Sequence, residues 1–146
     1  MNAEKLNEMK ELLQHAKIAY VSSVCETGHP NTKAMLVLER DNIVTHYFST
    51  NFSAKRTQQF LHNPKACIYF CRENEFKGLM LVGSMQVLTD HDHKARLWRE
   101  GFEIYYPKGI DDEDYCVFKF TTESGNYYHG LQNETFSLEE MTLWNI

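Results

Sequence analysis

Two patterns of different period meet in the stretch Tyr47-Phe48-Ser49-Thr50-Asn51-Phe52-Ser53-Ala54-Lys55-Arg56. Its aromatic and hydroxyl-bearing first half predicts the end of a β-strand, and a helical pattern runs from about Ser53 to His62. Lys55 and Arg56 then fall in the first helical turn, where unpaired N–H groups and the helix dipole already provide positive charge. Each cation there costs roughly a few tenths of a kcal/mol unless an anion compensates. The stretch therefore predicts either a phosphate site or a solvated basic helix end.

A third cation, Lys33, lies in the preceding strand, on the same face as Met35 and Val37. A lysine among apolar neighbours either extends its ammonium group to water or meets an anion. Local conflicts of this kind tend to occur at functional sites. The residues alone leave both interpretations of the three cations open.

The remaining sequence predicts strands interrupted by helices at two points. An amphipathic helix is expected over residues 2–14, and strands over 18–24, 32–39, 43–50, 65–71 and 77–89. Asp90 can cap a helix that runs to about Glu100, and Ser137 with Glu140 forms a capping-box pattern. A final hairpin is expected from strands 115–122 and 126–131, turning at Ser124-Gly125. About six strands in this order predict a mainly β, α+β fold, an antiparallel barrel with flanking helices in one domain.

Composition excludes several classes of function. The chain has 146 residues, 42% of them hydrophobic, and a net charge of −5, which disfavours nucleic-acid binding and a polybasic membrane anchor. No apolar run approaches the ~20 residues needed to span a bilayer, so we expect a cytoplasmic protein. Cys67 and Cys71 would lie about 13 Å apart on a strand, too far for one metal, and we expect them to be buried thiols. The clusters at residues 90–93 and 111–114 are better explained as a capped helix start and a solvent loop, so no metal site is predicted.

Several short pieces occur in a recognisable order. They are Gly28-His29-Pro30, Lys33-Ala34-Met35, Phe48-Ser49-Thr50, Ser53-Ala54-Lys55-Arg56, Asn63-Pro64-Lys65-Ala66-Cys67, Leu81-Val82-Gly83 and Leu97-Trp98. From about Lys17 to Leu138 the chain resembles the pyridoxamine 5′-phosphate oxidase-like superfamily of FMN-binding split barrels, and most closely its general-stress-protein branch. The resemblance implies a six-stranded split β-barrel, preceded by a helix at about 2–16 and followed by a short tail after about 138. It also implies a homodimer that binds FMN at the subunit interface.

The resemblance assigns cofactor roles to particular residues. The FMN phosphate would be held by Lys33, Ser53, Lys55 and Arg56, and the isoalloxazine ring would lie along the backbone of Lys33, Ala34 and Met35 and of Phe48, Ser49 and Thr50. The strand position of Lys33 is often arginine in the family, and lysine offers a point charge instead of a bidentate fork. Gly83 could admit the flavin or a second backbone, or could mark a bulge. Trp98 could cover the flavin edge of a partner chain or fill the core or interface. Aromatic residues often lie near the cofactor at the position of Tyr127, and which face of this last strand is core is left open.

One departure bears on activity. True pyridoxine-phosphate oxidases carry an arginine-and-histidine substrate motif near the C-terminus, where this chain has Asn126-Tyr127-Tyr128-His129-Gly130 and no arginine. We therefore do not assign that oxidase activity. The sequence favours an FMN-dependent oxidoreductase of unknown substrate, with a small-molecule or nicotinamide electron donor. A non-catalytic flavin- or haem-binding stress or sensor protein is the alternative, and a dimeric scaffold with an empty groove is a third. No catalytic residue is identified.

Overall fold

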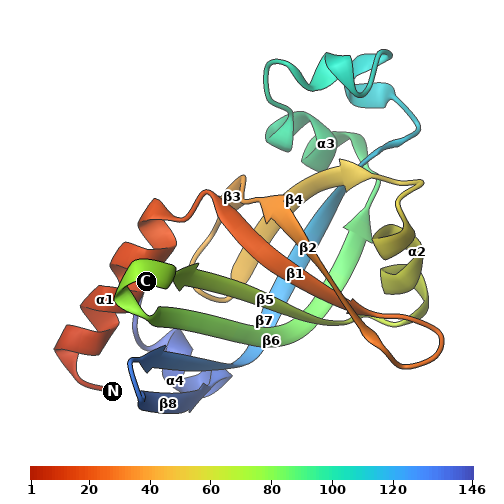
Figure 1. Cartoon of the computed structure of the whole chain (residues 1–146). Coiled ribbons are helices and arrows are strands. Elements are labelled where there is room, and N and C mark those ends of the chain that lie inside the picture. Colours follow the sequence, from red (N-terminus) through yellow and green to blue (C-terminus); the bar gives the residue numbers. More distant parts are fainter.

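The strands form a single curled antiparallel sheet in the computed structural model, which describes all 146 residues (Figure 1). The strands are β1 (Ile18–Val24), β2 (Pro30–Leu36), β3 (Glu39–Arg40), β4 (Thr45–Asn51), β5 (Lys65–Arg72), β6 (Lys77–Leu88), β7 (Tyr115–His129) and β8 (Gln132–Ser137). Their order is β2-β1-β5-β6-β7-β4-β3, and β8 pairs with β7 outside this path. Strands β2 and β4 approach each other without pairing. The sheet is thus a half-barrel that is open along the β2–β4 seam, the arrangement of a split barrel. The sequence predicted β1, β2, β4, β5 and β6, but it divided β7 into two strands, and β3 and β8 were not predicted.

Four α-helices flank the sheet: α1 (Ala3–His15), α2 (Lys55–His62), α3 (His91–Leu97) and α4 (Leu138–Thr142). In Figure 1, α1 and α2 lie at opposite ends of the barrel. The predicted caps are confirmed, because the Asp90 side chain accepts from the amide of His93 and both bonds of the Ser137–Glu140 capping box are present. Helix α3 ends at Leu97, earlier than expected, and single-turn 3₁₀ helices follow at Phe102–Ile104 and Gly109–Asp111.

Two groups of buried side chains make up the core. The larger fills the barrel and includes Phe48, Phe118 and Phe120, with Met9 and Leu12 of α1 packed against it. The smaller lies between α3 and the sheet and is built on Tyr47, Leu97, Tyr106, Tyr115 and Val117. Aromatic side chains contribute the most apolar area per residue, so this second group holds the segment after β6 firmly on the barrel.

The predicted hairpin at Ser124-Gly125 is wrong. Strand β7 continues without interruption from Tyr115 to His129, and the chain turns at Gly130, whose φ is +61°. Gly125 is not a turn residue, because a Cβ atom there would lie 2.4 Å from the ring of Phe136. Its missing side chain makes room for the Phe136 ring. Strand β6 pairs with β7 along this whole length, which keeps the chain extended.

Gly83 lies at a bulge where the β6–β7 register shifts between Val82 and Gly83. A Cβ atom at this position would lie 1.9 Å from the carbonyl oxygen of Thr121 in β7. Of the alternatives left open by the sequence, a bulge and a closely approaching second backbone both occur here. The sheet therefore accounts for this glycine, and its contact with a flavin stays a prediction.

The cysteines differ from expectation. All four are free thiols, but only Cys116 is buried, whereas Cys67 and Cys71 are half-buried on the outer face of β5. The prediction that Cys67 and Cys71 are buried is therefore wrong for a single chain, because nothing in one chain covers that outer face. No group of three or more His, Cys, Asp or Glu side chains is placed to hold a metal ion. None of the helices is long and apolar enough to cross a membrane.

Candidate functional site

The three predicted cations line one hollow at the end of the barrel that carries α2. This basic hollow has a volume of about 220 Å³ and is lined by Val21, Ser23, Asn31, Thr32, Lys33, Lys55, Arg56 and Gln59. Lys33 reaches it from β2, where it pairs with Val21 of β1, and the other two cations reach it from α2. None of the three forms an ion pair with a carboxylate of the chain. The structure thus brings together residues 33, 55 and 56 around one concave surface with unbalanced positive charge.

The start of α2 adds further donors to this hollow. Lys55 and Arg56 are the first two residues of the helix, two positions later than the predicted start at Ser53. The first turn has no acidic residue, and Ala54 at the N-cap provides no side-chain bond. The backbone amides of Lys55 and Arg56 make no hydrogen bond. These amides and the helix dipole favour an anion at this point.

Arg56 is the most constrained of the three cations. Its Nη2 atom donates to Thr50 Oγ1 of β4, and its Nε atom is buried without a hydrogen-bond partner. Burial lowers the pKa of this guanidinium, because removal from water disfavours the charged form. A half-buried arginine without an anionic partner costs free energy that a bound anion would recover.

Ser53 occupies a different environment from the one predicted for a phosphate ligand. Its amide donates to Asp114 Oδ1 at 2.8 Å, and its hydroxyl accepts from Asn51 Nδ2 at 3.2 Å. It does not line the basic hollow. Asp114 belongs to the acidic loop of residues 111–114, and its carboxylate partly compensates the positive charge at the start of α2. A contact between Ser53 and the phosphate stays a prediction.

The open seam of the barrel lies beside the hollow and is bordered by the two strands predicted to carry a ring. β2 pairs only with β1, so its other edge offers free backbone N–H and C=O groups. Met35 and Phe48 point into the core and are buried, whereas Ala34 is exposed on the outer face. The backbone of residues 33–35, rather than its inward side chains, is therefore available to a planar ligand.

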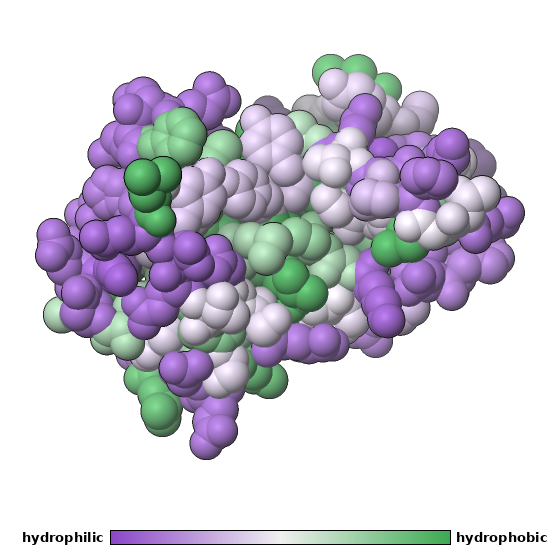
Figure 2. All heavy atoms as spheres, turned by 60° about the horizontal axis from the view of Figure 1, so that its bottom comes forward, coloured by the Kyte–Doolittle hydropathy of each residue, from purple (hydrophilic) through white to green (hydrophobic).

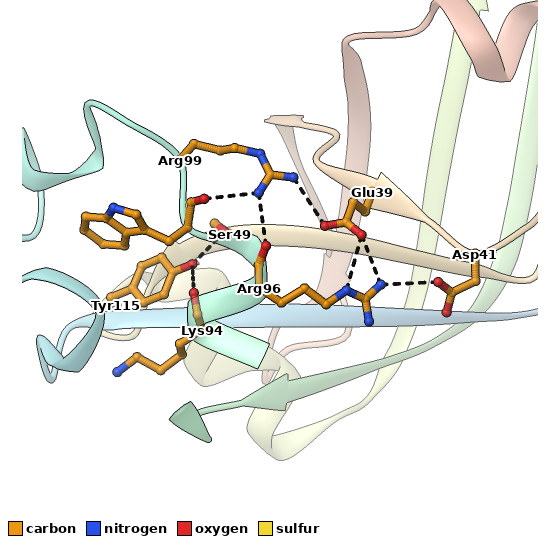
Figure 3. Close-up of polar contacts among 8 residues, drawn as sticks. Glu39, Asp41, Ser49, Lys94, Arg96, Arg99 and Tyr115 are labelled. Carbon is orange, nitrogen blue, oxygen red and sulfur yellow. Dashed lines mark hydrogen bonds and ion pairs between the residues drawn. The ribbon is translucent and has the colours of Figure 1, made fainter. Parts of the chain in front are cut away.

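Ser49 and Thr50 of β4 are fixed by polar contacts. The Tyr115 hydroxyl donates to the carbonyl of Lys94 at 3.0 Å and lies 3.3 Å from Ser49 Oγ, so Ser49 is the donor of that bond (Figure 3). Thr50 is buried and accepts from Arg56. β4 is therefore tied both to α3 and to the basic hollow.

An ion-pair cluster lies between the β3–β4 side of the sheet and the end of α3, where Arg99 follows the helix. Figure 3 shows the guanidinium groups of Arg96 and Arg99 approaching Glu39, at 3.1 and 3.3 Å from its two carboxylate oxygens. Arg96 also lies 3.3 Å from Asp41 and over the ring of Tyr47. These groups are partly exposed, so each pair contributes little free energy. Because both arginines are already paired, they add no free cation to the basic hollow.

Comparison with known proteins identifies the family. The pyridoxamine 5′-phosphate oxidase family model matches residues 6–129. The chain belongs to the pyridoxamine 5′-phosphate oxidase family. A search among curated proteins finds no match.

One solved structure supports the assignment, and two more distant ones share the fold. A Clostridium acetobutylicum protein related to general stress protein 26 of B. subtilis, of the pyridoxinephosphate oxidase family, is 44% identical, with 97% of this chain and 99% of that chain covered and a TM-score of 0.86. General stress protein 26 from Bacillus anthracis str. Sterne is 16% identical, with coverage of 91% and 98% and a TM-score of 0.74. A haem-binding protein from Mycobacterium smegmatis shares the fold, with 12% identity, coverage of 98% and 62% and a TM-score of 0.72.

The remaining predicted cofactor residues of this pyridoxamine 5′-phosphate oxidase family member lie away from the hollow. Trp98 packs edge-on against Tyr115 at a ring-centroid distance of 5.2 Å and is a partly buried side chain at the border of the smaller core group. Tyr127 is buried beneath α1, and its hydroxyl donates to Glu8 at 2.5 Å. Tyr128 lies on the opposite, outer face, which settles the open question of the face of β7. Within one chain neither Trp98 nor Tyr127 reaches the basic hollow, so their cofactor contacts stay predictions.

Sequence reasoning missed four polar residues that line the basic hollow of this family member. Asn31 and Thr32 precede Lys33 on β2, and Ser23 of β1 bonds Gln59 of α2 at 2.5 Å. The correct pairing of β1 with β2 would have revealed them, because Ser23 pairs with Asn31 and Ser22 with Thr32 next to Lys33. That register depends on where β2 begins, and the predicted strand began at residue 32, two residues later than β2 does.

The outer face of the sheet carries exposed apolar side chains. Five of them, from β1, β2 and β6, are exposed: Ile18, Tyr20, Leu36, Met80 and Val82. Paired residues point to one side of a sheet, and the pairs Ile18–Leu36, Tyr20–Tyr69 and Tyr69–Met80 join these side chains into one outer patch. Figure 2 shows white and green atoms running across the middle of the underside of the barrel, between purple margins. Contiguous apolar patches of this kind mark interaction surfaces.

Proposed function

We propose that this chain binds FMN and acts as a flavin-dependent oxidoreductase, with the FMN phosphate in the basic hollow. One observation carries the proposal: Arg56 has a buried Nε without a partner in a hollow that also collects Lys33 and Lys55. A phosphate dianion would accept from Arg56 and from the free amides of residues 55 and 56, and would offset two of the three positive charges. The residues present therefore fit the phosphate group of the cofactor.

The ring of the flavin is proposed to lie along the free edge of β2, between two copies of the chain. The backbone of residues 33–35 is open there, and Ala34, next to the outer patch, has no large side chain to obstruct a planar ligand. A second copy seated on the outer patch would bury its apolar side chains and exclude water from the ring. The homodimer is thus part of the same proposal.

Bound FMN supplies the redox centre. The chain holds the phosphate with three cations and orients the ring through backbone groups of β2. Apart from Lys33, Lys55 and Arg56, no titratable side chain lines the basic hollow. We therefore infer that the chain contributes binding and electrostatics rather than a side-chain acid or base, and that the electron donor and acceptor both come from solution.

Calorimetric titration of the apoprotein with FMN tests the phosphate site. Arg56→Ala removes a charge-assisted contact worth about 1.5–3 kcal/mol, which corresponds to a roughly 10- to 150-fold weaker affinity. Lys55→Ala should add a smaller loss, because Lys55 is exposed. The control Lys10→Ala/Lys108→Ala removes two positive charges, as Lys55→Ala and Arg56→Ala do together, but at positions that do not line the hollow. It should retain the wild-type affinity for FMN. If Arg56→Ala binds FMN like the wild type, the phosphate lies elsewhere.

A non-catalytic binding protein is the second candidate, supported by the shared fold of the haem-binding protein from M. smegmatis. Absorbance of the purified protein separates the candidates. Flavin bands that NAD(P)H bleaches without oxygen support the oxidoreductase, whereas flavin bands that resist nicotinamide reduction support storage or sensing. A Soret band would instead indicate haem.

A further inference from the structure

A separate hollow lies at the end of the barrel that carries α1, whereas α2 and the basic hollow lie at the other end (Figure 1). This α1 hollow, of about 330 Å³, opens between the last turn of α1, the start of β1 and the end of β5. It shares no lining residue with the basic hollow. Its volume is near the lower end of the range for small-molecule sites, about 300–1,000 Å³. It therefore suits a small ligand that binds independently of the proposed flavin.

Apolar side chains form one wall of the α1 hollow. Leu12 of α1 and Ala16 after the helix line it together with Ile18 and Tyr20 of β1. Ile18 is 44% exposed and Tyr20 is 38% exposed, although both side chains are large. Removing such surface from water is favourable. The wall therefore accepts a ligand with a hydrocarbon or aromatic body.

Unpaired charges of both signs surround this apolar wall. Lys17 and Glu73 line the hollow, and neither takes part in an ion pair of the chain. Arg72 also lines it, and its Nη1 atom donates to Glu75 at 3.0 Å, which leaves its other N–H groups free. The α1 hollow thus offers cationic donors to a carboxylate and a carboxylate to an ammonium group.

His15 provides a second acceptor at the end of α1. Its Nδ1 atom lies 2.8 Å from the carbonyl oxygen of Glu11, and because a carbonyl only accepts, Nδ1 carries the proton. Nε2 of the neutral ring is then a free acceptor in the hollow. A simple anion would find Lys17 but be repelled by Glu73, and a simple cation would meet the opposite conflict. Only a ligand that carries both charges satisfies the two groups together.

We propose that the α1 hollow binds a free α-amino acid with an apolar side chain, such as phenylalanine. Its carboxylate lies at Lys17 and Arg72, its ammonium group lies at Glu73 and His15, and its side chain covers the apolar wall. The inference goes beyond the proposed function and does not depend on it, because the two hollows share no residue.

Calorimetric titration with phenylalanine and with 3-phenylpropionate, which lacks the ammonium group, tests the inference. We expect one phenylalanine per chain, bound roughly 5-fold or more tightly than 3-phenylpropionate. Glu73→Gln should weaken phenylalanine alone, whereas Lys17→Gln should weaken both ligands. The exposed residues Lys10 and Glu113 do not line the hollow, so Lys10→Gln and Glu113→Gln are the matched controls. Absence of phenylalanine binding, or equal affinities of the wild type for the two ligands, would overturn the inference.

Alkylation of Cys71 provides a readout that does not depend on affinity. Cys71 lines the α1 hollow, whereas Cys67, half-buried on the same face of β5, does not. Burial raises the pKa of both thiols, which makes Cys67 a matched internal control. Saturating phenylalanine should slow the reaction of Cys71 with N-ethylmaleimide near neutral pH roughly 5-fold or more, measured by peptide mass spectrometry, and should leave Cys67 unchanged.

Two results of the alkylation experiment would contradict an amino acid in the α1 hollow. One is an equal rate at Cys71 with and without phenylalanine. The other is protection of Cys71 that follows protein concentration instead of phenylalanine, because a second copy of the chain would then fill the hollow.

Discussion

Asp114 accepts a hydrogen bond from the backbone amide of Ser53 at 2.8 Å, across 61 positions of sequence. Ser53 immediately precedes the N-cap of α2, so the acidic loop fixes where this helix begins. The carbonyl of Asp114 also accepts from the amide of Phe52 at 2.6 Å. The loop that the sequence suggested to be merely solvated therefore holds the helix that carries Lys55 and Arg56.

Asp114→Ala should lower the free energy of unfolding by about 1–2 kcal/mol, because the amide of Ser53 loses its acceptor. Asp114→Asn retains an acceptor oxygen and should recover part of the loss. The neighbour Glu113 is exposed, so Glu113→Ala is the matched control. Urea denaturation followed by circular dichroism measures the difference. Equal stability of Asp114→Ala and Glu113→Ala would show that the loop does not hold the helix.

Gly83→Ala tests whether the sheet alone requires this glycine. The added methyl group would meet the carbonyl oxygen of Thr121 at 1.9 Å, so β6 and β7 must separate at the bulge. Forcing extra volume into a packed region costs about 1–3 kcal/mol, and backbone atoms yield less readily than side chains. We expect a loss of at least about 2 kcal/mol in urea denaturation without flavin. Ser84→Ala, the next residue of β6, should change stability by less than about 1 kcal/mol. If Gly83→Ala is as stable as the wild type without flavin, the sheet does not require this glycine, and a close contact with the flavin becomes its explanation.

The parts of the fold that the sequence predicted depend on local patterns. Alternation located β1, β4, β5 and β6, and the side-chain chemistry of Asp90 and Ser137 located the starts of two helices. The misplaced hairpin shows the limit of such patterns. Ser124-Gly125 has the composition of a turn, but its conformation is decided by pairing with β6 and by the ring of Phe136, both distant in sequence.

The candidate site could be predicted in the same partial way. The charge conflict at Lys55 and Arg56 is local, so the sequence revealed it. The contacts of Ser23 with Gln59, and of Asp114 with Ser53, join residues 36 and 61 positions apart and need the folded sheet. The outer patch was missed because β5 and β6 have apolar residues on both faces, a pattern that indicates burial without saying what covers the strand.

His46 makes stability depend on pH. Its side chain is fully buried between the rings of Phe70 and Phe120, and burial lowers its pKa to about 4. In the unfolded chain its pKa is about 6.5. As the pH falls from about 6.5 to about 4, the unfolded chain takes up a proton that the folded chain does not, so the free energy of unfolding decreases by up to about 3 kcal/mol.

The His46→Phe variant should lose this contribution. We expect its unfolding free energy, measured by urea denaturation at several pH values, to depend less on pH than that of the wild type over the window from about 6.5 to about 4. The exposed His15 of α1 provides the control His15→Ala, which should retain the wild-type slope. Parallel curves for the wild type and His46→Phe would mean that His46 is not the group responsible.

Val82→Glu tests the proposed homodimer. Val82 belongs to the outer patch, and in a twofold-symmetric interface the substitution places two carboxylates in an apolar contact, where burial without a partner costs several kcal/mol. We expect sedimentation velocity to change from a dimer for the wild type to a monomer for the variant. FMN affinity should fall with it, because the ring loses the cover of the second copy.

Ile104 is 79% exposed on the turn after α3, so Ile104→Glu should leave both the dimer and the affinity intact. A monomeric wild type, or a Val82→Glu variant that remains dimeric, would exclude the outer patch as the interface. A monomeric variant with undiminished FMN affinity would confine the flavin to one chain, since the basic hollow and the free edge of β2 would then be sufficient to hold it.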